Sequence, residues 1–169
     1  MEFSIRKAVI NEAHDFALCK IRAWQSAYRG IIPDEYLNNM SVEKYTELYK
    51  EWMENPNAEY YFAMCNDEIA GILVLSKCDN DDKQNAGDIT AIYLLEPYWY
   101  KGYGRIMMNY AINRLKSLLY EEITIWSLEK NVRAHEFFEK FGFVLDGKKM
   151  EMNWGEPFVI VRHVINLSW

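Results

Sequence analysis

Two helical segments, each following directly on a strand-like run, constrain the fold of this chain most strongly. Apolar side chains recur at helical spacing in residues 104–119, and residues 88–95 before them read as a strand. Residues 123–128 and 131–141 repeat that order of strand and helix. Crossover helices mixed with runs of strands are typical of a sheet in which not all neighbours are antiparallel. The pattern therefore predicts an α+β, or mixed α/β, domain.

The remaining elements follow from periodicity and turn residues. Asn66 and Asp67 tolerate positive φ and join two strand-like runs in a hairpin, and Gly142 is a natural left-handed end for the last helix. We find no linker, and we expect a single domain over residues 1–169. The predicted strands cover residues 4–8, 60–65, 69–76, 88–95, 123–128, 143–152 and 158–167, and the predicted helices cover 13–28, 34–39, 42–53, 104–119 and 131–141. Residues 79–87 are acidic and amide-rich, which favours a solvated loop.

Composition narrows the class of protein. With 50% hydrophobic residues the chain is not disordered, and no apolar run approaches the roughly 18 residues that span a membrane. The first eight residues read as a strand, not as a signal peptide. Three widely spaced cysteines fit a reducing cytoplasm better than a disulfide framework. The net charge of −6 disfavours nucleic-acid binding. His14, His135 and His163 lack metal-ligand spacing, so we predict no metal site.

The segment of residues 88–105 carries the clearest chemical signal. Its strand ends in a short turn, and Gly102 and Gly104 then lead into a helix. Glycines let a backbone approach a ligand closely, and the first turn of a helix offers unpaired N–H groups and a partial positive charge. Lys101 and Arg105 flank the same place. These features predict a phosphate or diphosphate site. The alternative is a glycine-containing loop that only turns the chain.

Other nucleotide-binding loops do not fit this segment. The chain has no G-x-x-x-x-G-K-[ST] sequence, and Met107 stands where the third glycine of G-x-G-x-x-G would be. A second group of residues follows in 131–143. The phenylalanines of that helix are expected to pack in the core, and Asn131 can serve as its N-cap.

These two segments, in this order and about thirty residues apart, resemble the GNAT superfamily of acetyl-CoA-dependent N-acetyltransferases. The loop of that family reads Q/R-x-x-G-x-G/A, and its later segment reads N-x-x-A-x-x-F-Y-[EQ]-K-x-G-F. Gly102 and Gly104 are in register with the loop. The matches to the later segment are Asn131, Ala134, Phe137, Glu139, Lys140, Gly142 and Phe143. Residues 5–8 and 24–37 also fit, so the resemblance covers nearly the whole chain.

The resemblance implies a central mixed, largely antiparallel, twisted sheet of about seven strands with four to five helices, splayed between the fourth and fifth strands. It also implies acetyl transfer from acetyl-CoA to a primary amine of a small molecule or peptide, in a ternary complex and without metal. The sequence allows a homodimer. The residues implied to hold coenzyme A are Ile92, Tyr93, Leu94, Trp99, Tyr100, Lys101, Gly102, Tyr103, Gly104, Arg105 and Asn131.

The chain departs from the family pattern at two important positions. Trp99 stands at the Q/R position of the loop, where the family's side chain helps to shape the diphosphate site. Phe138 stands where many members carry a tyrosine that protonates the departing thiolate, and phenylalanine cannot donate that proton. A thiol has a pKa near about 8.5, so its thiolate leaves readily. We therefore expect a slower enzyme or a replacement acid, for which the candidates are Tyr93, Tyr98 and Tyr103.

The amine must lose a proton, and Asp88 or Glu129 is a candidate base, although either can equally be surface charge. Trp24, Tyr28 and Tyr36 are candidates for the acceptor site, with a core aromatic stripe as the alternative. The acidic net charge and these aromatic faces favour a cationic acceptor. The departures at Trp99 and Phe138 leave a second class of function open. That alternative is a non-catalytic domain that binds or senses acyl-CoA.

Overall fold

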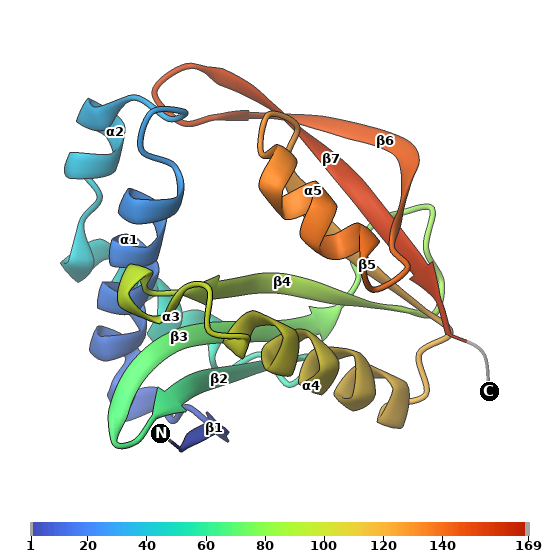
Figure 1. Ribbon diagram of the computed structural model, residues 1–169, viewed down its shortest axis with the longest axis horizontal. Helices are drawn as coiled ribbons and strands as arrows, with labels where there is room; N and C mark the ends of the chain where they lie inside the picture. The colour runs from blue at the N-terminus through green and yellow to red at the C-terminus, as the bar shows by residue number, and fades with distance from the viewer. Residues whose placement is uncertain (1, 168–169) are drawn as a thin grey trace.

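The computed structural model describes residues 2–167 and contains a seven-stranded sheet in the order β1-β2-β3-β4-β5-β7-β6 (Figure 1). Neighbouring strands are antiparallel except β4 and β5, which are parallel. The mixed, largely antiparallel α+β sheet that the sequence predicts is thus confirmed. The strands are β1 (Phe3–Lys7), β2 (Ala58–Cys65), β3 (Glu68–Lys77), β4 (Ala86–Leu94), β5 (Glu122–Leu128), β6 (Val144–Asn153) and β7 (Pro157–Asn166).

The helices cover the sheet unevenly. In Figure 1, α4 and α5 lie in front of the sheet, and α1, α2 and α3 gather at its left end. The α-helices are α1 (Ala13–Ala27), α2 (Asp34–Asn38), α3 (Val42–Trp52), α4 (Tyr103–Ser117) and α5 (Val132–Glu139), and the short 3₁₀ helices are η1 (Ile10–Glu12) and η2 (Glu96–Tyr98). Most ends fall within two residues of those predicted from the sequence. No helix among the described residues is both long and apolar enough to cross a membrane.

The sheet opens between its fourth and fifth strands. β4 and β5 pair only at Ala86–Glu122, Gly87–Ile123 and Asp88–Thr124, after which the two strands diverge toward the left of Figure 1. We call this last pair, Asp88 with Thr124, the vertex. The splay implied by the family resemblance is therefore present.

One core cluster joins the two halves of the sheet on the side of α4 and α5. Leu73 and Ile89 contribute to it from one half, and Ile123, Ile125 and Phe143 contribute from the other. A second cluster packs α1 and α3 against β2 and β3 through Phe16, Tyr49 and Phe62. The splay is thus an opening between two strands of the sheet, and the hydrophobic core is continuous across it.

The acidic loop between β3 and β4 is largely exposed, as the sequence predicts, but it also binds a buried arginine. Its Asp82 carboxylate accepts a hydrogen bond of 2.8 Å from Arg162, and Asn80 accepts one of 3.0 Å from the same guanidinium. Arg162 lies on β7, is 2% exposed, and also donates to Asp146 at 2.8 Å. A buried cation requires paired anions, and the loop supplies one of them from about 80 residues away in sequence.

Candidate functional site

The splay leaves one edge of β4 without a neighbouring strand. Leu95 donates its N–H to Ala70 of β3, and the Tyr93 carbonyl faces Gly71 of the same strand. Successive residues of a strand direct their backbone groups to opposite edges. The peptide groups of Ile92 and Leu94 therefore face the opening, where a ligand can pair with them.

The loop after β4 delivers backbone donors to the same end of the splay. η2 follows β4, Tyr100 and Gly102 both adopt the left-handed conformation with φ of 61° and 84°, and α4 begins at Tyr103. No side chain among the described residues caps this helix start. Lys101 and Arg105 lie beside it and are exposed. Free N–H groups, the helix dipole and two cations are the features expected of an anion site, and this assignment stays a prediction.

The two glycines of the loop serve different purposes. A Cβ on Gly102 would meet nothing within 4 Å, so the space in front of this residue is open and only its φ requires glycine. A Cβ on Gly104 would lie 3.4 Å from Phe137 of α5. This is an ordinary van der Waals distance, so Gly104 lies at the contact of α4 with α5 and the packing there does not by itself require glycine.

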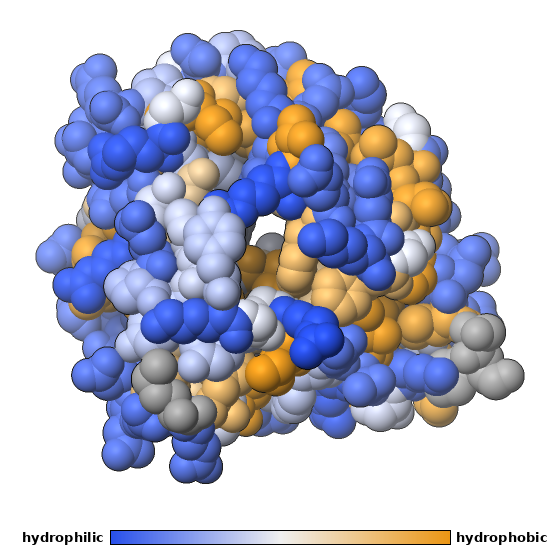
Figure 2. Space-filling view, in the orientation of Figure 1, coloured by the Kyte–Doolittle hydropathy of each residue, from blue (hydrophilic) through white to orange (hydrophobic). Residues whose placement is uncertain are grey.

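Trp99, Tyr100 and Arg133 form what we call the aromatic clamp. The Trp99 indole donates a hydrogen bond of 2.8 Å to the Leu94 carbonyl, at the free edge of β4. The Arg133 guanidinium of α5 lies 4.8 Å from the Trp99 ring centroid and 4.6 Å from that of Tyr100. Because Arg133 belongs to the other side of the splay, the clamp bridges its mouth. Figure 2 shows an opening in the surface in this part of the molecule.

The sequence analysis missed Arg133, since it occupies an unspecified position of the family segment. It also left Trp99 as a departure of unknown effect. The structure shows that the indole satisfies a strand carbonyl and stacks on a cation, which a glutamine or arginine would do differently. Tyr100 is 86% exposed and strained at positive φ, and its ring is held out over Arg133.

The residues predicted for the acceptor site lie together, packed around Tyr93 of β4. Trp24 and Tyr28 of α1 pack with Tyr93, Trp154 and Phe158 in a group that we call the aromatic cluster. Ring centroids of Trp24 lie 4.9 Å from Tyr28, 5.1 Å from Trp154 and 6.5 Å from Tyr93. Tyr36 is only partly buried and packs at the margin of the cluster, near Gly155. Trp24 and Tyr28 are buried in this cluster, as the alternative of a core aromatic stripe predicts, and their part in the acceptor site stays a prediction.

Two tyrosine hydroxyls inside the aromatic cluster are paired. Tyr28 Oη and Tyr93 Oη lie 3.1 Å apart. Burial raises the pKa of Tyr93, and burial together with the Tyr93 hydroxyl raises the pKa of Tyr28 well above its usual range. Both groups are therefore protonated at neutral pH.

The other candidate acids are placed elsewhere. Tyr98 donates its hydroxyl to Glu68 at 3.0 Å on the surface. The Tyr103 ring stacks on Phe3 at 4.3 Å, and its hydroxyl lies 3.7 Å from the Cys65 sulfur in the core. Of the three tyrosines considered from the sequence, Tyr93 lies at the splay. Because the Tyr103 side chain is turned into the core, only its backbone N–H is available to the predicted anion site.

Phe138 lies in the main core. It is 5% exposed, with ring centroids 5.5 Å from His163 and 6.3 Å from Phe143. His163 is fully buried, and neither of its ring nitrogens has a hydrogen-bond partner among the described residues. The imidazole also packs 5.1 Å from that of His135, and burial followed by His135 lowers the pKa of His163. His163 is therefore neutral at pH 7.

The two carboxylates considered as bases are differently placed. Asp88 sits at the vertex, where it accepts hydrogen bonds of 2.6 Å from Thr124 and 2.9 Å from Thr90, and burial raises its pKa to about 6. Five residues of strand, or about 16 Å, separate it from Tyr93. Glu129 is exposed and paired with Lys149 at 2.7 Å. Asp88 is thus distant from the aromatic cluster along β4, and the Glu129 carboxylate is held by Lys149.

Asn131 caps the helix that follows it, and its predicted contact to coenzyme A stays a prediction. Its side-chain oxygen accepts the Ala134 N–H at 3.2 Å and caps α5. This is the N-cap role that the sequence allows for Asn131, and it uses the side-chain oxygen as a hydrogen-bond acceptor.

Lys20 is a second functional candidate that the sequence analysis missed. Its ammonium lies 4.6 Å from the Trp24 ring centroid and 5.4 Å from that of Tyr45. The signal was present, because Lys20 falls four residues after Phe16 and four before Trp24, in the apolar stripe of α1. A lysine on the apolar face of a helix is unusual, because its charge is then partly removed from water.

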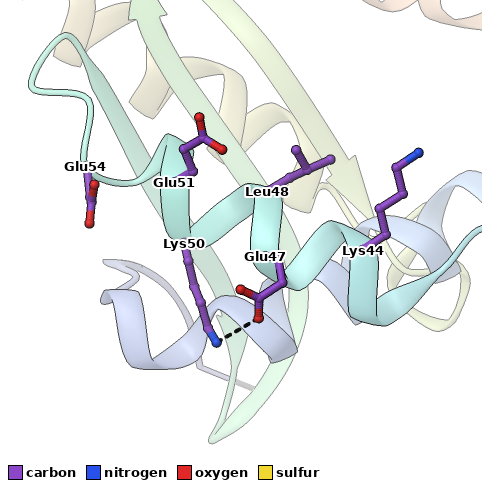
Figure 3. A pocket seen from close by; sticks show the side chains of 6 residues that line it. All are labelled: Lys44, Glu47, Leu48, Lys50, Glu51 and Glu54. Carbon is purple, nitrogen blue, oxygen red and sulfur yellow. Dashed lines mark hydrogen bonds and ion pairs between the residues drawn. The ribbon is translucent and has the colours of Figure 1, made fainter.

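A separate depression lies on α3 (Figure 3). Its lining is mostly charged and includes Lys44, Glu51 and Glu54, with Lys50 and Glu47 joined by an ion pair of 3.0 Å. It contains none of the predicted site residues. No group of His, Cys, Asp or Glu within residues 2–167 has a metal-binding arrangement.

Comparisons with known proteins converge on one family. The sequence model of the acetyltransferase (GNAT) family matches residues 22–143, which include the splay, the loop and both flanking helices. The uncharacterized N-acetyltransferase YuaI of Bacillus subtilis is 25% identical over 131 residues, covering 76% of this chain and 73% of that protein. The uncharacterized N-acetyltransferase MJ1207 of Methanocaldococcus jannaschii is 23% identical over 158 residues, covering 90% of this chain and 64% of that protein.

Solved structures share the whole fold. PaiA N-acetyltransferase of Thermoplasma acidophilum, in complex with coenzyme A, aligns with a TM-score of 0.73 at 20% identity, over 99% of this chain and 100% of that one. The structure of yncA from Salmonella typhimurium, with its cofactor acetyl-CoA, aligns with a TM-score of 0.74 at 11% identity, over 100% of this chain and 96% of that one. At these identities the likeness concerns the fold.

Proposed function

Since this chain belongs to the acetyltransferase (GNAT) family, we propose that it transfers the acetyl group of acetyl-CoA to a primary amine of a small molecule or peptide. The observation that carries the proposal is the splay. It presents the free backbone edge of β4 beside the uncapped start of α4, so one extended ligand can use both. The two relatives named N-acetyltransferases, and the two aligned structures that hold coenzyme A or acetyl-CoA, support it.

The residues present fit coenzyme A. The diphosphate would accept hydrogen bonds from N–H groups of residues 100–105, where the open space before Gly102 leaves room for phosphate oxygens. The amide-containing arm would pair with the Ile92 peptide group at the free edge of β4. The Leu94 carbonyl is already bonded to Trp99, so we assign it no part in that pairing.

The reaction is a direct transfer. The lone pair of the neutral amine attacks the thioester carbonyl carbon, a C–N bond forms, and the C–S bond breaks with its electron pair on sulfur. The amine nitrogen releases one proton, and the thiolate takes one up. Tyr93, kept protonated by burial and paired with Tyr28, is our proposed donor to the thiolate. We propose that the amine proton leaves to water, because Asp88 lies about 16 Å from Tyr93 along the strand and the Glu129 carboxylate is paired with Lys149.

A non-catalytic acyl-CoA-binding domain is the second candidate. The observation in its favour is Phe138, which fills the position of the family's acidic tyrosine with a buried ring that donates no proton. Both candidates bind coenzyme A, so cofactor binding alone does not separate them.

The deciding experiment is release of free thiol from acetyl-CoA in the presence of a panel of primary amines. We expect turnover with at least one amine. Tyr93→Phe should lower kcat about 10- to 100-fold with coenzyme A affinity unchanged, since the ring is retained and only the donor is lost. Coenzyme A binding without turnover of any amine would favour the sensor domain. A protein that binds no coenzyme A would contradict both.

A further inference from the structure

We propose that the acceptor carries an anionic group, a carboxylate, which pairs with the Lys20 ammonium at the edge of the aromatic cluster. The substrate class is then amines that bear a carboxylate, of the amino-acid type. This inference rests on the proposed function and specifies its acceptor.

Lys20 is a partly buried cation without an anion. Its ammonium is placed over two aromatic rings, those of Trp24 and Tyr45, and no ion pair joins it to a carboxylate anywhere in residues 2–167. Burial lowers its pKa to about 8, and no nearby carboxylate acts in the opposite direction. At pH 7 most of the side chain is nevertheless charged.

Three other partly or fully buried cations of this protein are paired with carboxylates. Arg162 has Asp82 and Asp146, and Arg114 donates two hydrogen bonds to Glu59 at 2.9 and 2.7 Å. Lys83, whose side chain is 13% exposed, lies 3.1 Å from Glu122. Charges that leave water are normally compensated in this way. The missing partner of Lys20 is what a bound anionic group would supply.

The position of Lys20 connects it to the transfer site. Trp24, on whose ring the ammonium rests, contacts Tyr28, and Tyr28 holds the Tyr93 hydroxyl at the splay. A carboxylate on Lys20 would therefore hold the acceptor along the aromatic cluster. Its amine would be directed toward the free edge of β4.

The same contact argues against the cationic acceptor favoured by the sequence. The face of Trp24 that would attract a substrate ammonium is already covered by the protein's own ammonium. A second cation there would meet a like charge in partly desolvated surroundings. The net charge of −6 describes the whole surface and does not offset this local repulsion.

The experiment compares matched pairs of amines by thiol release: glycine, methionine and glutamate against glycinamide, methioninamide and glutamate α-amide. The wild type, Lys20→Met, Lys20→Arg and the control Lys50→Met are measured after circular dichroism confirms that each is folded. Lys50 is an exposed lysine paired with Glu47 on α3. We expect the wild type to prefer the carboxylate member of at least one pair by about 10- to 100-fold in kcat/KM, mainly through KM.

Lys20→Met should reduce that preference to within about threefold. Lys20→Arg should retain most of it, and Lys50→Met all of it. The proposal is overturned if the wild type turns over the amides as well as or better than the acids. It is equally overturned if folded Lys20→Met keeps the full preference. Should Lys20→Met fail to fold, the wild-type preference and the Lys20→Gln variant decide.

The outcome remains separate from that of the proposed function. Turnover of amides alone would support acetyl transfer and overturn the anionic acceptor. If no amine is turned over, binding is measured by calorimetry with N-acetylmethionine and N-acetylmethioninamide on protein saturated with coenzyme A. Tighter binding of the acid, lost in Lys20→Met, supports the Lys20 site even then. Equal binding of the two compounds, or binding of neither, contradicts it.

Discussion

Phe138 and His163 show that the role of a single residue depends on the side chains packed against it. A phenylalanine in place of a tyrosine looks from the sequence like the loss of an acid. In the structure it is also a core side chain, in contact with an imidazole that has no hydrogen-bond partner. The apolar ring therefore has a structural reason to be there, independent of catalysis.

We expect Phe138→Tyr to lower the free energy of unfolding by about 1–3 kcal/mol, because it adds a hydroxyl to a buried site. Urea unfolding measures the loss, and Phe141→Tyr just after the same helix, where the ring is only partly buried, should cost less. Equal stability of Phe138→Tyr and wild type would show that the hydroxyl finds a partner.

His163 makes stability depend on pH. Its folded pKa is lowered, so below its ordinary value of 6.5 the unfolded chain binds a proton that the folded chain does not. The stabilisation is present above about pH 6.5 and is lost as pH falls through the folded pKa. Compared with His163→Leu, the wild type should lose free energy of unfolding between pH 7.5 and pH 5. Parallel pH profiles of the two proteins would contradict this assignment.

At the scale of elements, the loop between β4 and α4 combines a strained backbone with an uncapped helix. Tyr100 and Gly102 both have positive φ, and the clamp holds the loop to α5. Such a loop exposes N–H groups at the cost of local stability, which is typical of a ligand site.

We expect Gly102→Val to weaken coenzyme A binding by at least about tenfold, since a β-branched residue resists φ of 84° and its side chain enters the open space. Calorimetry with coenzyme A provides the measurement. Gly147→Val is the matched control, because Gly147 has φ of 87° with the same open surroundings but lies on β6. Unchanged affinity in Gly102→Val, or an equal loss in Gly147→Val, would contradict the placement of the diphosphate.

At the scale of the whole molecule, two halves of a sheet share one core and are joined by three residue pairs at the vertex. Asp88 and Thr124 close that junction with a hydrogen bond of 2.6 Å, and Arg162 ties the β3–β4 loop over it. Because the core is continuous across the splay, we assign the Asp88 carboxylate a positioning role at the junction.

Asp88→Asn should remove a component of the pH dependence. The folded pKa of about 6 lies above the ordinary 3.8, so between these values the folded state holds a proton that the unfolded state has lost. The free energy of unfolding of the wild type should therefore fall by about 1–3 kcal/mol relative to Asp88→Asn as pH rises from 4 to 7. Thermal unfolding at both pH values measures it. A difference between the two proteins that is constant with pH would refute the assignment.

The order and type of the elements and the glycine loop could be predicted from the residues of this sequence, whereas the splay was implied by the family resemblance. The elements and the loop depend on periodicity, turn residues and short motifs, which act over a few neighbouring residues. The left-handed conformations of Asn66, Gly102 and Gly142 are likewise a local property of the residue type at each turn.

The contacts that specify the site could not be predicted in this way. Trp99 with Arg133, Tyr28 with Tyr93 and Arg162 with Asp82 join residues from about 30 to 80 positions apart, and no local pattern records such pairs. Lys20 is the clearest case. Its place in the stripe of α1 is visible in the sequence, but its lack of a counter-ion is not. Whether a buried charge is compensated depends on every segment that packs around it, which only the folded chain decides.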